Sequence, residues 1–147
     1  MARIAKFVVT HEVGHSLGLC HNFIGSSAYT VEQLRTPAFV AKYGTTPSIM
    51  DYTRFNYIAQ PEDKMDSKLL SPNVGIYDCF AIEWGYRYYR HHANSDSLLK
   101  EWVTQQQEQR ELRFANNSGI DPEVQSEDLS NDLLAANALG IENLKYM

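Results

Sequence analysis

HEVGHSLGLCH, residues 11–21, is the stretch that decides how this chain folds around a site. His11 and His15 are four residues apart, so on an α-helix they project from one face about one turn from each other. Gly18 can adopt the positive φ that ends a helix sharply. The chain can then turn back and bring His21 beside the first two imidazoles.

These side chains predict a metal site. Three histidines at these offsets suit one Zn²⁺ ion and leave its fourth tetrahedral position for water, as in catalytic zinc sites. Glu12 lies roughly 100° around the helix, within reach of a metal-bound water without being a ligand, and is the expected general base. The alternative is an amphipathic helix whose histidines are surface or core residues. The added glycine and third histidine lower the chance of coincidence to about one in 10⁵.

A second motif, SIMDY, runs from Ser48 to Tyr52. With the first stretch, it resembles the extended zinc motif and the Met-turn of the metzincin metallopeptidases. The resemblance implies that Met50 forms an apolar floor beneath the metal. It implies that Tyr52 can ligate zinc at rest and swing to hydrogen-bond the oxyanion. Taken alone, core packing is the commoner role of a methionine.

The chain also looks like a family of large secreted bacterial zinc-dependent metalloproteases. The similar stretches, in the same order, are GLCHNF, YGTTPSIMDYTRFNYIAQPED, IYDCFAIEWGYRY and SEDLSNDLLAANALGIENLKYM. This implies a peptide or protein substrate and a secreted, periplasmic or cell-surface parent protein. Cys20 departs from the basic residue expected there. The pair His91 and His92 has no counterpart, and we expect it to be exposed rather than a second metal site.

The composition of the chain excludes several classes of function. A chain of 147 residues with 44% hydrophobic and 21% charged residues predicts a single globular domain with one modest hydrophobic core. The net charge of −5 argues against nucleic-acid binding, and no apolar run is long enough to span a membrane. No long apolar region follows Met1, so we expect no signal peptide within this sequence. Cys20 and Cys79 allow at most one disulfide, and we favour reduced thiols because a bridge beside His21 could disturb the ligand.

The motif begins after only ten residues. In metzincins the zinc-binding helix lies about halfway through the catalytic domain, after a sheet whose edge strand binds the substrate. We therefore expect a mainly α fold with few or no strands, the C-terminal half of a metzincin-like catalytic domain. Residues 1–92 would hold the active-site helix, the Met-turn and the following helix. Residues 93–147 would form a helical extension packed on it.

Three functions follow as hypotheses. The first is zinc-dependent peptide-bond hydrolysis, and the second is a zinc-binding fragment that is catalytically incompetent because the substrate-binding sheet is missing. The third, an interaction domain with a vestigial motif, is disfavoured because Glu12 and Tyr52 are not needed for folding. We expect the isolated chain to bind zinc with poor turnover, and to self-associate through the apolar face left without the sheet.

Local patterns predict the other elements. Apolar spacing predicts a helix over residues 4–17, and Thr36-Pro37 predicts a helix start with the threonine hydroxyl as N-cap. That helix would run to Tyr43 and stop at Gly44. Residues 55–59 favour a short strand. Further helices are expected over residues 77–86, 98–110 and from Ser130 towards Tyr146, the last with an inward face of Leu133, Leu134, Ala138, Ile141 and Leu144.

Several acidic residues can be interpreted in two ways. Asp78 is either a cap or buried anchor near the Met-turn, or an uncapped surface aspartate, and the sequence favours neither. Four carboxylates of the C-terminal third invite a calcium site, but their spacing fits no EF-hand loop and helix capping explains them more simply. They are Asp121, Glu127, Asp128 and Asp132.

Overall fold

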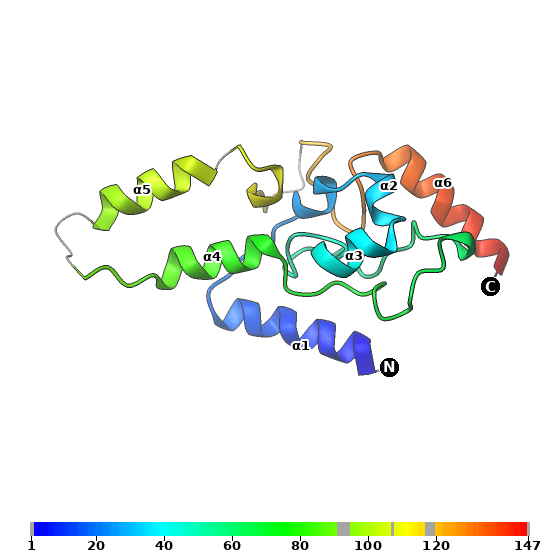
Figure 1. The fold of residues 1–147 in the computed structure, drawn as a ribbon, viewed down its shortest axis with the longest axis horizontal. Coiled ribbons are helices and arrows are strands. Elements are labelled where there is room, and N and C mark those ends of the chain that lie inside the picture. The colour runs from blue at the N-terminus through cyan, green and yellow to red at the C-terminus, as the bar shows by residue number, and fades with distance from the viewer. Residues whose placement is uncertain (1, 91–94, 107, 117–119, 147) are drawn as a thin grey trace.

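The computed structural model describes residues 2–90, 95–106, 108–116 and 120–146, which form six α-helices joined by loops and short 3₁₀ turns (Figure 1). These described residues contain no strand, so the mainly α prediction is confirmed. The helices are α1 (Ala2–Ser16), α2 (Val31–Leu34), α3 (Pro37–Tyr43), α4 (Ile76–Tyr86), α5 (Ser95–Gln106) and α6 (Leu133–Asn143). The 3₁₀ turns are η1 (Gly25–Ala28), η2 (Pro61–Asp63), η4 (Arg110–Leu112) and η5 (Leu144–Tyr146).

Helix α1 ends at the predicted glycine. Gly18 has φ +87°, and its N–H donates to the carbonyl of His15 at 2.9 Å. The N–H of Leu19 reaches back to the carbonyl of Gly14 at 3.0 Å, which completes a Schellman closure of the helix. The chain therefore reverses direction within two residues of Ser16.

Helix α3 has the predicted bounds, but its predicted cap is wrong. The hydroxyl of Thr36 caps no backbone N–H of α3 and instead donates to the carbonyl of Glu32 at 2.7 Å. The reason is the preceding helix α2, whose terminal carbonyls need donors and lie closer to that hydroxyl.

The predicted strand over residues 55–59 is also wrong. Its backbone is held by irregular contacts rather than by a neighbouring strand. The N–H of Asn56 donates to the carbonyl of Leu70 at 2.7 Å, and its side-chain amide donates to the carbonyl of Leu34, also at 2.7 Å. Its side-chain oxygen accepts from the N–H of Ile58. Apolar alternation here serves burial of Ile58, not sheet formation.

The hydrophobic core lies between α2, α3, the segment around Ile58 and the C-terminal segment. Its buried members are Tyr29, Leu34, Ile58, Leu129 and Ala136. Side chains from both halves of the sequence therefore share one core, whereas α1, α4 and α5 contribute none of these five.

Helix α6 is rotated from its predicted orientation. Ala136 is buried and Leu139 packs against the core, whereas Leu134 and Ile141 are 85% and 63% exposed. Polar contacts set this rotation, because the side-chain amide of Asn143 donates to the carbonyls of Tyr57 and Ala59, which the apolar pattern alone did not anticipate.

Helices α4 and α5 lie side by side, away from the core (Figure 1). Phe80 stacks on Trp102 with ring centroids 4.9 Å apart, and the Arg87 guanidinium lies 4.7 Å from the same indole. Helix α5 begins and ends earlier than the predicted range 98–110. The pair His91 and His92 lies outside the described residues. No helix among the residues that are described combines the length and apolar character needed to cross a membrane.

Candidate metal centre

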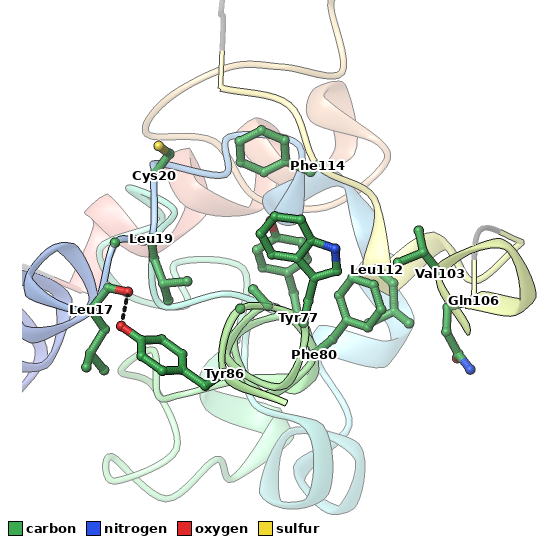
Figure 2. A pocket seen from close by; sticks show the side chains of 14 residues that line it. Leu17, Leu19, Cys20, Tyr77, Phe80, Tyr86, Val103, Gln106, Leu112 and Phe114 are labelled. Atoms are coloured by element: carbon green, nitrogen blue, oxygen red, sulfur yellow. Dashed lines mark hydrogen bonds between the residues drawn. The ribbon is translucent and has the colours of Figure 1, made fainter. Parts of the chain in front are cut away.

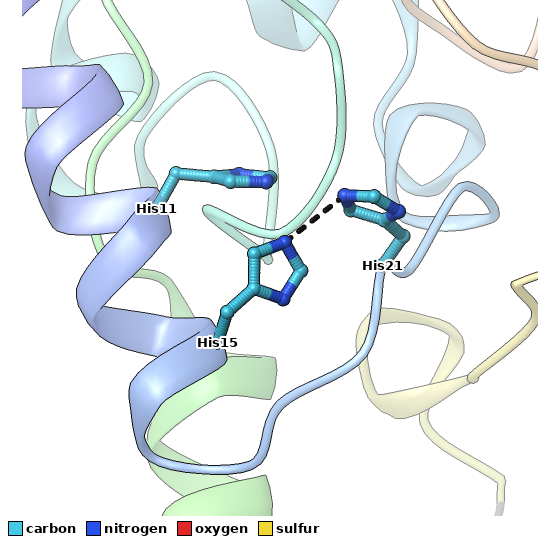
Figure 3. A group of neighbouring side chains, drawn as sticks. All are labelled: His11, His15 and His21. Atoms are coloured by element: carbon cyan, nitrogen blue, oxygen red, sulfur yellow. Dashed lines mark hydrogen bonds between the residues drawn. The ribbon is translucent and has the colours of Figure 1, made fainter.

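The three histidines converge in the structure (Figure 3). His11 and His15 project from one face of α1, and His21 faces them from the segment after the Gly18 turn. The Nε2 atoms of His15 and His21 are 3.1 Å apart, and one nitrogen from each of the three rings lies within 4.8 Å of the others. Of the residues described, this is the one group of three or more His, Cys, Asp or Glu side chains that could hold a metal ion.

Backbone carbonyls orient two of the rings. Nδ1 of His11 lies 2.8 Å from the carbonyl oxygen of Ile49, and Nδ1 of His15 lies 2.9 Å from that of Leu19. A carbonyl oxygen only accepts, so each Nδ1 carries the proton and each Nε2 of the neutral ring keeps its lone pair. Such second contacts are the usual way in which proteins fix the tautomer of a metal-binding histidine.

The donor set fits a zinc ion. Tetrahedral Zn–N bonds of about 2.0–2.1 Å require nitrogen–nitrogen separations of about 3.3 Å, close to the 3.1 Å between His15 and His21. Nε2 of His11 is buried without a hydrogen-bond partner in the described residues, which leaves it free for a ligand bond. Burial, and then the nearby imidazoles of His15 and His11, lower the pKa of His21, favouring the neutral form that coordinates metals.

Met50 lies beneath the helix, fully buried. A Cβ atom placed on Gly14 would come within 2.4 Å of its sulfur, so α1 can rest on Met50 only because residue 14 has no side chain. Sequence reasoning missed Gly14. Its position between two predicted ligands on a packed helix face is the signal that could have identified it.

Asp78 is the buried anchor rather than a surface residue, with 3% exposure. Its carboxylate accepts from the hydroxyl of Ser48 and the N–H groups of Ile49 and Gly75, each at 2.8 Å. A Cβ on Gly75 would lie 2.0 Å from the carbonyl oxygen of Pro47, so this glycine lets α4 approach the turn closely. Burial raises the pKa of Asp78, against the effect of these donors.

Glu12 and Tyr52 line one hollow of about 270 Å³ together with His11. The Tyr52 ring lies 4.6 Å from the ring of His21 and 5.4 Å from that of His11, measured between centroids. The side chains that sequence analysis named for catalysis are thus next to the three imidazoles.

Two further residues support this region and were not predicted. Asn22 donates from its side-chain amide to the carbonyl of Arg113 at 3.0 Å and accepts from the N–H of Ala115 at 3.0 Å. Arg54 lines the same hollow and forms a two-point ion pair with Glu127, at 2.7 and 2.6 Å. Both partners lie in the C-terminal third, so no local sequence signal could have identified them.

A larger cavity than the hollow beside the histidines lies elsewhere in the described residues. It has a volume of about 450 Å³, and α4 lines it with Tyr77, Phe80 and Trp84 (Figure 2). The Tyr86 hydroxyl closes one side by donating to the carbonyl of Leu17 at 3.0 Å. His11, His15 and His21 do not line this apolar cavity, so it is separate from the candidate metal centre.

Of the four carboxylates for which helix capping was predicted, Asp132 is the one that caps a helix of the described residues, whereas Glu127 pairs with Arg54. The Asp132 side chain caps α6 by accepting from Ala135, and Asp121 accepts from the N–H of Glu123. No disulfide joins Cys20 and Cys79, and both are exposed.

Comparison with known proteins gives one match. A protein-family model described as Met-zincin matches residues 1–147. No curated protein and no solved structure matches the chain.

Proposed function

The chain belongs to the Met-zincin family, and on that premise we propose that it binds one Zn²⁺ ion and hydrolyses peptide bonds. The observation that carries the proposal is the convergence of three imidazoles, two of them oriented through Nδ1 by backbone carbonyls. We assign His11, His15 and His21 as the ligands, Glu12 and Tyr52 as the catalytic residues, and Gly18 and Met50 as structural support.

Zinc bound there would polarise a water molecule and lower its pKa towards about 7. Glu12 takes the proton from the attacking water and passes it to the leaving amine. The Tyr52 hydroxyl donates a hydrogen bond to the oxygen of the scissile carbonyl as negative charge develops on it. The carbonyls of Ile49 and Leu19 hold the two helix imidazoles in the tautomer that this chemistry needs.

Replacing Glu12 tests the assigned roles. We expect Glu12→Gln to keep zinc at one ion per chain, by mass spectrometry of metal content, and to lower hydrolysis of a peptide library by about 10²–10⁴-fold. His15→Ala is the matched variant, and it should lose zinc as well as activity.

A chelator control must abolish the parent's activity. Unchanged hydrolysis by Glu12→Gln would rule out its role as general base. Zinc binding without any turnover in the parent would favour the alternative of a catalytically incompetent metal-binding chain.

A further inference from the structure

A second hollow, of about 400 Å³, lies along the first turns of α1 and carries a cluster of cations. We call it the basic hollow. Arg3 and Lys6 come from α1, and Lys68 comes from the loop before α4. Three positive side chains around one hollow contrast with the net charge of −5 for the whole chain.

These cations are not neutralised. Among the described residues, no carboxylate lies within ion-pair distance of any of the three, whereas Arg54 in the neighbouring hollow is already paired with Glu127. Arg3 donates from Nη1 to the hydroxyl of Ser67 at 3.0 Å, which ties α1 to the loop without removing the charge.

The basic hollow adjoins the candidate metal centre. Phe7 lines both the basic hollow and the hollow that contains Glu12 and Tyr52. Ile49, whose carbonyl orients the His11 ring, lines the basic hollow as well. A ligand extended over Phe7 would therefore contact both hollows.

From this placement we propose that the basic hollow binds carboxylate side chains of the substrate, so that the preferred substrate is an acidic peptide. The inference rests on the proposed function. Lys6 and Lys68 supply positive charge, and the floor of Phe7 and Ile49 suits the aliphatic part of a glutamate side chain. Exposed ion pairs are individually weak, so three together imply a preference of about tenfold.

The test compares two fluorescent peptides on the full chain without metal, where no hydrolysis interferes. One peptide is rich in glutamate, and the other carries glutamine at the same positions. We expect the glutamate peptide to bind about tenfold more tightly, with the difference shrinking as salt shortens the Debye length. In the double variant Lys6→Gln with Lys68→Gln, the two peptides should bind within about twofold of each other.

The matched control is Lys42→Gln with Lys100→Gln, which removes the same charge away from both hollows and should keep the preference. Equal binding of the two peptides by the parent would overturn the inference, as would loss of the preference in the control. Displacement of the glutamate peptide by an equal concentration of inorganic phosphate would also overturn it, because the hollow would then be a general anion site. Circular dichroism checks that each variant folds. Because binding is measured without metal, a preference seen in a chain that hydrolyses nothing would refute the proposed function alone.

Discussion

At the scale of single residues, the environment of the Met-turn is set by buried polar groups. Asp51 follows Met50 and is fully buried, with one carboxylate oxygen accepting from the N–H of Ser26 at 2.6 Å. The other oxygen has no hydrogen-bond partner in the described part of the chain. The pKa of Asp51 is raised from 3.8 to about 8, chiefly by burial and to a lesser extent by the nearby Asp128, against the lowering effect of the hydrogen bond from the Ser26 N–H.

This raised pKa predicts a pH-dependent stability. The folded state holds the proton of Asp51 more tightly than the unfolded state does. The contribution of this group to the free energy of unfolding is therefore fully present below about pH 4 and is lost as pH rises towards 8. Asp51→Asn mimics the protonated form at every pH. Between pH 4 and 8 its free energy of unfolding should therefore fall by roughly 2–5 kcal/mol less than that of the parent. Urea unfolding of both proteins from pH 4 to 8 measures it. Parallel profiles would contradict the assignment.

Gly14 supports a second prediction. Gly14→Ala should destabilise the fold by about 1–3 kcal/mol, because the new Cβ would overlap the sulfur of buried Met50. Gly85 is the control, since a Cβ there meets no atom within 4 Å and Gly85→Ala should stabilise α4 by about 0.5–1 kcal/mol. In thermal unfolding, the midpoint temperature should fall for Gly14→Ala and rise for Gly85→Ala. Equal shifts in the two variants would show that Met50 does not constrain residue 14.

At the scale of elements, the segment that carries Met50 is joined to α4 in addition to the hydrogen bonds within its own turn. The carboxylate of Asp78 in the first turn of α4 takes three hydrogen bonds, two of them from the segment that carries Met50. Ile49, which it fixes through the backbone N–H, in turn orients His11. Helix α4 therefore helps to position an imidazole of the candidate metal centre through Ile49.

Asp78→Ala should consequently change both stability and metal affinity. Loss of the carboxylate leaves two buried backbone donors unpaired and should cost about 2–4 kcal/mol. Zinc affinity, measured by competition with a chromophoric chelator, should fall together with stability, since the His11 tautomer loses its support. Asp78→Asn keeps one acceptor and should show a smaller loss of both. Unchanged zinc affinity in Asp78→Ala would refute the link.

The sequence anticipated elements whose signals are local. The offsets of His11, His15 and Gly18 follow from helix periodicity and from glycine's access to positive φ, so their arrangement was predictable. The rotation of α6 was not, because it depends on Asn143 meeting carbonyls 84 and 86 residues away. The role of Arg54 likewise depends on Glu127, 73 residues distant. Such partners can be identified only once the tertiary structure brings them together.

At the scale of the whole molecule, the outer face of α1 is apolar and uncovered. Val9, Val13 and Leu17 are spaced four residues apart, so they share one face, and they are 60%, 50% and 44% exposed. Val13 and Leu17 also line an apolar hollow of about 280 Å³. Contiguous exposed apolar surface of this kind favours association.

We therefore expect the chain to self-associate through α1. Val9→Gln with Val13→Gln should shift the sedimentation coefficient towards the monomer at micromolar concentrations. Leu134→Gln with Ile141→Gln changes two exposed apolar residues of α6 instead and should leave association unchanged. A parent that sediments as a monomer would contradict the prediction.

The contacts of Asn22 have a consequence for the order in which the molecule is built. This residue follows His21 directly, yet its side chain is held by backbone groups 91 and 93 residues further along the chain. During synthesis the histidine motif emerges before these partners, so the loop that presents His21 lacks them until Ala115 has left the ribosome. Contacts of such long sequence separation form slowly. Metal capture is therefore expected as a late step in the maturation of the newly made chain.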